Sequence, residues 1–175
     1  MIREVYIFDI DGCIMPPIFI NFNNSEPRRK IVNQVIKNGN NVKLFPRFID
    51  FYNTHCKQAS LIYFITGRKA SEFSNLTEQQ LKFLAEIKDF QVIYYPEGKP
   101  HKIHKYFDWK VKEIKGIIKD IIKSKSFNEQ AKIKFNIFDD MNDYFRKLRK
   151  ITEKWRIQIN LTLIESENDW KNLFK

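Results

Sequence analysis

The sequence is poor in cysteine and has no long apolar run. Its two cysteines, Cys13 and Cys56, have a spacing that fits neither metal ligation nor a disulfide framework. No apolar run approaches the length of a membrane span, and the chain passes from Met1 straight into Arg3 and Glu4, which leaves no room for a cleavable signal peptide. We therefore expect a cytoplasmic protein in a reducing compartment, without a membrane partner.

Internal repeats, linkers and low-complexity tracts are also missing, and a length of 175 residues suits one domain with a substantial core. Hydrophobic residues make up 43% of the chain and aromatic residues 15%, including 16 Phe. This composition is typical of a globular protein and not of a disordered one. We expect a single domain over residues 1–175, with a core rich in aromatic rings.

The charge balance is basic, with 31 Lys and Arg against 21 Asp and Glu and a net charge of +10. Such an excess favours polyanionic partners such as nucleic acid. The lysines are spread along the chain together with many Asn and Ile, and a general compositional bias would produce the same excess. Both interpretations stay open at this point.

The most informative stretch is residues 4–14, an apolar run that ends in Asp9, Asp11 and Gly12. A short apolar run closed by a turn signal is typical of a strand buried on both faces of a parallel sheet, where ligand sites lie at the carboxyl ends of the strands. Two carboxylates held this close need a cation, a shared proton or different tasks. One such division is a nucleophile and an acid/base. Acidic pairs of this spacing also occur in calcium loops and in simple strand-to-turn corners.

Strands and helices are expected to alternate along the rest of the chain. Further apolar runs predict strands at 61–65, 90–95, 133–138 and 155–164. Helices are expected from Pro46 to about Cys56, after a capping box at 77–80, and at 107–123. This order predicts a parallel sheet with helices on both faces and the first strand near its centre.

The segment 13–43 is expected to be an insertion of irregular structure and one β-hairpin. It carries Pro16, Pro17 and Pro27 and shows no helical periodicity. Asn38-Gly39 supplies the positive φ angles that a two-residue hairpin turn requires. The hairpin would be either a flap beside a site or an ordinary surface insertion.

Polar residues follow two other predicted strands. Thr66 and Gly67 end the strand at 61–65, where a hydroxyl and backbone N–H groups suit phosphoryl oxygens, although a Thr-Gly corner is also a common turn. Arg68, the next residue, either holds this loop or faces solvent. Among the lysines of helix 107–123, Lys110 lies nearest the apolar face and the site, with Lys112 and Lys115 as alternatives.

The series Phe8-Asp9-Ile10-Asp11-Gly12, Ile65-Thr66-Gly67-Arg68, Lys110 and Phe138-Asp139-Asp140 resembles the haloacid dehalogenase (HAD) superfamily of phosphohydrolases and phosphotransferases. The resemblance covers most of residues 4–150. It implies a Rossmann-like three-layer α/β sandwich with a central, mostly parallel sheet, a small flap and no full cap domain. The site would therefore be open to bulky substrates.

The resemblance also implies a role for each motif. Asp9 would be the nucleophile, Asp11 the acid/base, Thr66 with Gly67 and Arg68 the phosphate-binding group, and Lys110 the cation beside the aspartyl-phosphate. The cofactor would be Mg²⁺, bound by Asp9, by Asp11 through its backbone carbonyl, and by the pair Asp139 and Asp140. Within that pair Asp140 would complete the metal shell while Asp139 faces Lys110, and Asp143 could bind a metal-bound water. A helix cap is the alternative for either member of the pair.

The expected function is that of a magnesium-dependent phosphomonoesterase acting through an aspartyl-phosphate. The chain is loosely similar to the HAD phosphatases associated with polynucleotide repair, so the substrate class extends to nucleotide or nucleic-acid-end phosphates. The rival is a catalytically inactive HAD-fold module that binds nucleic acid. The intact acidic set, with Asp9, Asp11, Thr66, Asp139 and Asp140 all present, argues against this rival.

Overall fold

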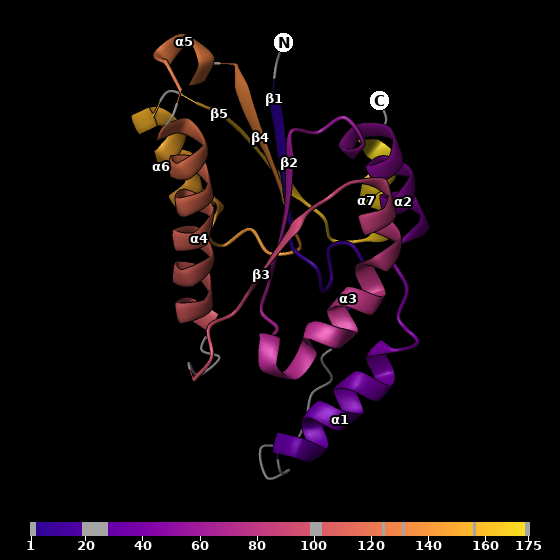
Figure 1. Cartoon of the computed structure of the whole chain (residues 1–175). Helices are drawn as coiled ribbons and strands as arrows, with labels where there is room; N and C mark the ends of the chain where they lie inside the picture. The colour runs from indigo at the N-terminus through magenta and orange to yellow at the C-terminus, as the bar shows by residue number, and fades with distance from the viewer. Residues whose placement is uncertain are drawn as a thin grey trace.

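The protein is a three-layer α/β sandwich around a five-stranded, all-parallel sheet of order β3-β2-β1-β4-β5 (Figure 1). The computed structural model describes residues 3–18, 28–98, 103–123, 125–130, 132–155 and 157–173. The strands are β1 (Arg3–Phe8), β2 (Leu61–Thr66), β3 (Gln91–Tyr94), β4 (Ile133–Asp139) and β5 (Gln158–Leu163). The predicted fold class and the central place of the first strand are confirmed.

From Val5 to Phe8, strand β1 is apolar because both of its faces are covered. Tyr6 and Phe8 belong to the core on one face of the sheet, and Val5 and Ile7 belong to the core on the other. Phe8 lies opposite Phe64 of β2 and Phe138 of β4, and their ring centroids are 5.5 and 5.1 Å from that of Phe8. Burial on both faces is what a continuous apolar run in a parallel sheet indicates.

One face of the sheet is covered by α2 (Pro46–Phe51), its π-helical continuation (Tyr52–Cys56), α3 (Ala70–Ile87) and α7 (Glu167–Asn172). Trp170 of α7 is completely buried among the rings of this core, and its indole N–H donates to the carbonyl of Cys13 at 2.9 Å. This bond fixes the last helix against the turn that follows β1. Both cysteines are buried and free.

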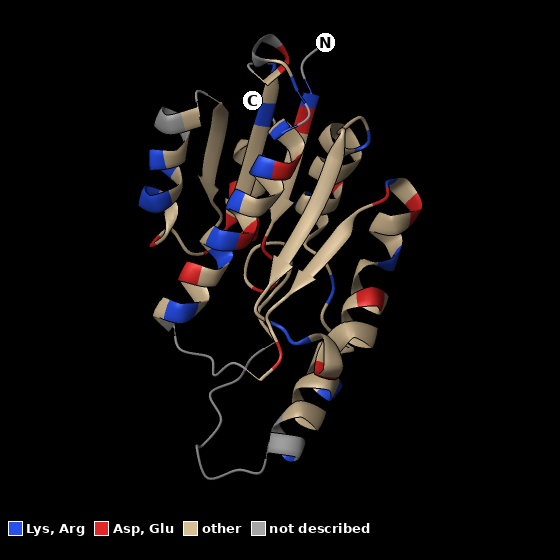
Figure 2. Cartoon of the chain, turned by 60° about the vertical axis from the view of Figure 1, so that its left-hand side comes forward, with Lys and Arg blue, Asp and Glu red and all other residues tan. Residues whose placement is uncertain are grey.

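The other face is covered by α4 (Ile103–Lys123) and α6 (Phe145–Trp155), with the short α5 (Phe127–Gln130) between them in the chain. Ile114 and Ile118 of α4 and Leu148 of α6 are among its fully buried residues. Lys and Arg lie mainly on the helices that flank the sheet, whereas the strands carry little charge (Figure 2). None of the helices in the described part of the chain is both long and apolar enough to cross a lipid bilayer.

The predicted hairpin at Asn38-Gly39 is wrong, because this segment forms helix α1 (Arg28–Gly39). Val32, Val35 and Ile36 recur at helical spacing and pack with Ile18 and residues of α3 in a small separate core. Gly39 does not have a positive φ. A Cβ on this residue would lie 2.7 Å from the side chain of Leu76, so glycine permits the close approach of α1 to α3. The insertion is thus helical, and residues 19–27 lie outside the described part of the chain.

Two helix starts also differ from the prediction. The supposed capping box at Thr77 lies inside α3, which begins at Ala70, and the Thr77 hydroxyl donates to the carbonyl of Phe73 at 2.8 Å, one turn earlier. Helix α4 begins at Ile103, a turn before the expected Phe107. A Thr-x-x-Gln pattern does not mark a helix start when the residues before it are already helical.

Candidate active site

The carboxyl groups of Asp9, Asp139 and Asp140 meet at the carboxyl ends of β1 and β4. These strands are parallel neighbours, and the Asp9 N–H donates to the carbonyl of Phe138 at 2.9 Å, so the two acidic ends lie at the same edge of the sheet. Each of the three residues offers an oxygen within 4.8 Å of the others. The side chain of Asp11 is not part of this cluster, and the resemblance implied metal ligation by Asp11 only through its backbone carbonyl.

Lys110 projects from α4 into the cluster and bridges two of its carboxylates. Its Nζ lies 2.7 Å from Asp9 Oδ1 and 2.5 Å from Asp139 Oδ2, and the side chain is 2% exposed. Burial lowers the pKa of Lys110, but Asp139 and Asp9 together outweigh that effect, so its pKa is raised and the group is an ammonium. Lys112 and Lys115, the alternatives, are exposed.

Asp139 uses both carboxylate oxygens on protein groups. Its Oδ2 accepts the ammonium of Lys110 and the hydroxyl of Tyr144 at 2.6 Å, and its Oδ1 accepts the N–H of Met141 at 3.0 Å. Helix α6 begins only at Phe145, so Asp139 is not its N-cap. The residue instead contacts the ammonium of Lys110, which also contacts Asp9, and this is the contact that the resemblance implied.

The cluster carries more negative than positive charge. Desolvation by burial raises the pKa of Asp9 well above its ordinary value, and Asp139 and Asp140 raise it further while Lys110 lowers it. Burial and the neighbouring Asp139 also raise the pKa of Asp140 to about 6. A hard divalent cation with oxygen ligands would remove this imbalance, so Asp9, Asp139 and Asp140 form a cluster that could hold a metal ion. Both oxygens of Asp139 already accept hydrogen bonds from the protein, whereas Lys110 and Tyr106 both donate to Oδ1 of Asp9. The donor set therefore fits best when Asp9 and Asp140 bind the ion.

Gly12 makes room for Asp140 at the turn after β1. It has a φ of +85°, and a Cβ at this position would collide with the carboxyl group of Asp140. The Gly12 N–H donates to the carbonyl of Met15 at 2.9 Å and closes the turn. The sharp turn expected after Asp11 is therefore present, and it requires glycine for both its backbone conformation and its space.

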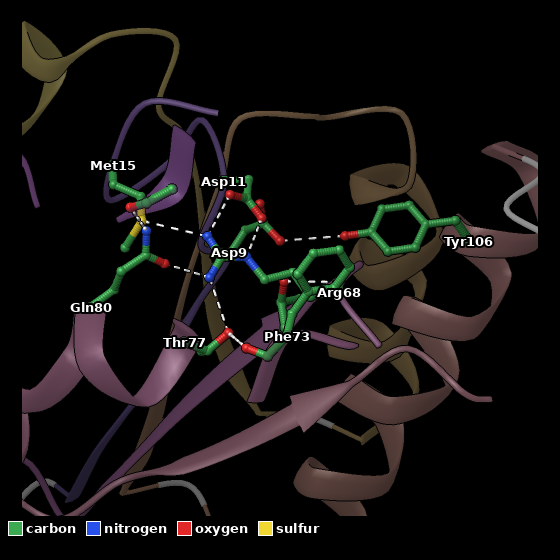
Figure 3. Close-up of polar contacts among 10 residues, drawn as sticks. Asp9, Asp11, Met15, Arg68, Phe73, Thr77, Gln80 and Tyr106 are labelled. Carbon is green, nitrogen blue, oxygen red and sulfur yellow. Dashed lines mark hydrogen bonds and ion pairs between the residues drawn. The ribbon is translucent and has the colours of Figure 1, made fainter. Parts of the chain in front are cut away.

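The side chain of Asp11 lies outside the cluster and forms an ion pair with Arg68 (Figure 3). Arg68 Nε lies 2.9 Å from one carboxylate oxygen of Asp11, and Nη2 lies 2.7 Å from the other. Arg68 is fully buried and Asp11 is 13% exposed. Of the two options that the sequence left for Arg68, exposure to solvent is wrong.

Thr66 ends β2, one residue beyond the level of Asp9 on the neighbouring strand. Its Oγ1 accepts the backbone N–H of Arg68 at 3.2 Å, so the hydroxyl hydrogen remains a donor that a phosphoryl oxygen could accept. Gly67, which follows, is half-buried in a bend. The strand order thus places Thr66 and Asp9 on adjacent strand ends.

Two tyrosines at the site were not predicted from the sequence. Lys110 Nζ lies 5.0 Å from the ring centroid of Tyr106 and 5.6 Å from that of Tyr144, and the Tyr106 hydroxyl donates to Asp9 Oδ1 at 3.4 Å. The available signal for Tyr106 was its position four residues before Lys110 on one helix. Asp143, by contrast, is exposed and lies outside the carboxylate cluster.

No family model and no curated protein sequence matches the chain. Its structure is similar to the crystal structure of a hydrolase from Streptococcus pneumoniae TIGR4, with a TM-score of 0.54 over 100% of both chains and 11% sequence identity. At this identity the likeness is one of fold. It supports the α/β fold that the strand order of this chain shows.

Proposed function

We propose that the protein is a magnesium-dependent phosphomonoesterase of the HAD type. The observation that carries the proposal is the buried trio of Asp9, Lys110 and Asp139 at the carboxyl edge of a parallel sheet, with Asp11 two residues beyond Asp9. A hydrolase has a similar fold, which supports hydrolysis in general. The order of the motifs along the chain supports the phosphoryl chemistry.

The residues divide the reaction into two displacements. A carboxylate oxygen of Asp9 attacks phosphorus while the ester P–O bond breaks, and Asp11 protonates the leaving oxygen. Asp11 then takes a proton from water, the water oxygen attacks phosphorus, and the bond between Asp9 and phosphorus breaks to release phosphate. Lys110 offsets the charge on Asp9 throughout. Mg²⁺, bound by Asp9 and Asp140, would supply charge neutralisation for the phosphate.

The distribution of charge supports a polyanionic substrate such as a nucleotide or a nucleic-acid end. Residues 28–49 contain no Asp or Glu, and their basic residues are Arg28, Arg29, Lys30, Lys37, Lys43 and Arg47. Helix α1, which holds the first four of these, lies beyond the carboxyl ends of the strands, on the side of the carboxylate cluster (Figure 1). A polyanion that reaches Asp9 with its terminal phosphate would pass near this basic segment.

Phosphate release from a panel of substrates tests the proposal. The panel contains an aryl phosphate, a sugar phosphate, nucleotides and oligonucleotides with 5′- or 3′-phosphate, each assayed with Mg²⁺ and with EDTA. We expect release that requires Mg²⁺, is fastest on oligonucleotide ends and falls steeply with added salt, because basic contacts to phosphates release counterions. Asp9→Asn, prepared in parallel, controls for contaminating phosphatases.

One result would contradict the proposed catalysis, and another would contradict the proposed substrate class. Oligonucleotide binding without phosphate release from any substrate would favour the inactive binding module. Mg²⁺-dependent release with equal rates on sugar phosphates and oligonucleotides at low salt would overturn the substrate class and leave the phosphatase assignment in place.

A further inference from the structure

Every N–H of the Arg68 guanidinium has an acceptor within the protein (Figure 3). Nε and one hydrogen of Nη2 serve the two oxygens of Asp11, and the second hydrogen of Nη2 is directed at Met15 Sδ at 3.6 Å. Nη1 donates to Thr77 Oγ1 at 3.0 Å and to Gln80 Oε1 at 2.6 Å. A guanidinium has five N–H donors, so Arg68 could bind a phosphate only by giving up one of these contacts.

The two side chains that accept hydrogen bonds from Nη1 of Arg68 each donate a further hydrogen bond of their own. Thr77 accepts from Arg68 and donates to the carbonyl of Phe73, and Gln80 accepts from Arg68 and donates through Nε2 to the carbonyl of Gly39 at 2.9 Å. The network therefore runs from the end of α1 through α3 to the turn after β1. A connected hydrogen-bond network of this kind holds its members in one arrangement.

We propose that Arg68 is a positioning residue for Asp11, with Gln80 as its support, and that it does not bind substrate. The inference rests on the proposed function, in which Asp11 protonates the leaving oxygen. The two-point contact fixes both oxygens of the Asp11 carboxyl group, and thus the direction from which it reaches the substrate. A displacement of about 1 Å at such a group costs up to ~100-fold in rate.

The leaving group of the substrate separates positioning of Asp11 from a general structural role. An alkyl phosphate needs protonation of its leaving oxygen, whereas 2,4-dinitrophenyl phosphate has a leaving group stable as the anion. The quantity to compare is kcat/KM, because it reports the transfer to Asp9 and is insensitive to the later hydrolysis. Gln80→Ala keeps both charges of the ion pair, and Gln79→Ala, at the exposed neighbouring position of α3, is its matched control.

We expect Gln80→Ala to lower kcat/KM about 10-fold for the alkyl phosphate and less than about 2-fold for the dinitrophenyl ester, with Gln79→Ala like wild type. Arg68→Lys should show a larger difference between the two esters, since an ammonium cannot make the two-point contact. Equal losses for both esters in Gln80→Ala would show a structural role and overturn the proposal. Where Arg68→Lys fails to fold, Gln80→Ala decides alone.

A second measurement does not depend on activity. The single variants Arg68→Met and Asp11→Asn should each lower the midpoint of thermal unfolding, and the double variant should lose less than the sum of the two shifts. Additive shifts would show that the ion pair is not formed and overturn the inference. Wild-type protein that releases no phosphate from either ester would overturn the proposed function, whereas release without a leaving-group effect in Gln80→Ala overturns only the role of Arg68.

Discussion

Asp9 and Asp11 are two residues apart, yet they lie in opposite electrostatic surroundings. Asp9 shares a buried site with two further carboxyl groups and one ammonium, so negative charge is in excess and its pKa is raised. Asp11 is paired one to one with a guanidinium. The difference shows that two carboxylates close in sequence can lie in separate electrostatic environments when their cationic partners come from different parts of the chain.

The backbone explains how the two side chains diverge. Alternate residues of a strand point to the same face, but β1 ends at Phe8 and the chain turns at Gly12. Asp9 therefore contacts Lys110 of α4, while Asp11 contacts Arg68, whose partners Thr77 and Gln80 belong to α3. These helices cover opposite faces of the sheet (Figure 1).

The largest expected effect follows from replacing the nucleophile. Asp9→Asn should lower kcat by at least about 1,000-fold, because a carboxamide does not form the covalent intermediate. The fold should persist, since the change removes one buried negative charge from a site in which negative charge exceeds positive charge. Stopped assays of phosphate release and circular dichroism measure the two outcomes. Asp50→Asn, at an exposed position of α2, should match wild type, and phosphate release by Asp9→Asn at the wild-type rate would refute the covalent route.

The next largest effects are expected from replacing Asp139 or Asp140, and they should differ between the two residues. Asp140→Ala should raise the Mg²⁺ concentration for half-maximal activity by about 10-fold or more, because it removes a ligand whose carboxyl group is not committed to Lys110. Asp139→Ala should lower kcat with a smaller change in that concentration, since it releases the ammonium of Lys110 from one of its two partners. A Mg²⁺ titration of both variants measures the order. The reverse order would exchange the two roles.

A smaller effect is expected from the tyrosines that flank Lys110. Tyr144→Phe removes a 2.6 Å hydrogen bond to Asp139 and should lower kcat several-fold, by about 1 kcal/mol of the activation barrier. Tyr106→Phe removes a longer bond, 3.4 Å to Asp9, and should have less effect. Parallel rate measurements on both variants test this order. Wild-type rates in both variants would show that neither hydroxyl orients its carboxylate.

The smallest expected effect concerns the metal-free protein and pH. The pKa of Asp140 is raised from 3.8 to about 6 in the folded state, so the native protein binds the proton more tightly than the unfolded chain does. The stability that this adds is present below about pH 4 and is lost as pH rises through about 6. It amounts to about 1 kcal/mol at most, because the group is partly exposed and screened.

Thermal unfolding in EDTA measures this effect as the difference between wild type and Asp140→Asn across that pH range. Mg²⁺ should abolish the fall in wild-type stability, since the cation favours the ionised carboxyl group. A difference between the two proteins that does not change with pH would contradict the raised pKa.

Much of the fold and of the site could be predicted because it depends on short-range patterns. The apolar runs ending in Asp9, Thr66 and Asp139 indicated strands buried on both faces, and parallel pairing then required their ends to meet at one edge. Helical geometry selected Lys110 over its neighbours. The hairpin at Asn38-Gly39 failed because the same dipeptide ends a helix whose glycine serves a close contact with Leu76, a long-range feature.

The sequence alone determined which chemical groups leave the strand ends, because strand and helix periods are local properties of the chain. Only the tertiary structure decided which partner each of these groups contacts. Asp11 is paired with Arg68, whose further partners Thr77 and Gln80 lie on α3. The partners of Asp139 include Lys110, 29 positions earlier in the chain. Which of several carboxylates meets a particular cation depends on how helices pack across the sheet. That packing is set by contacts between residues far apart in sequence, and no local pattern encodes it.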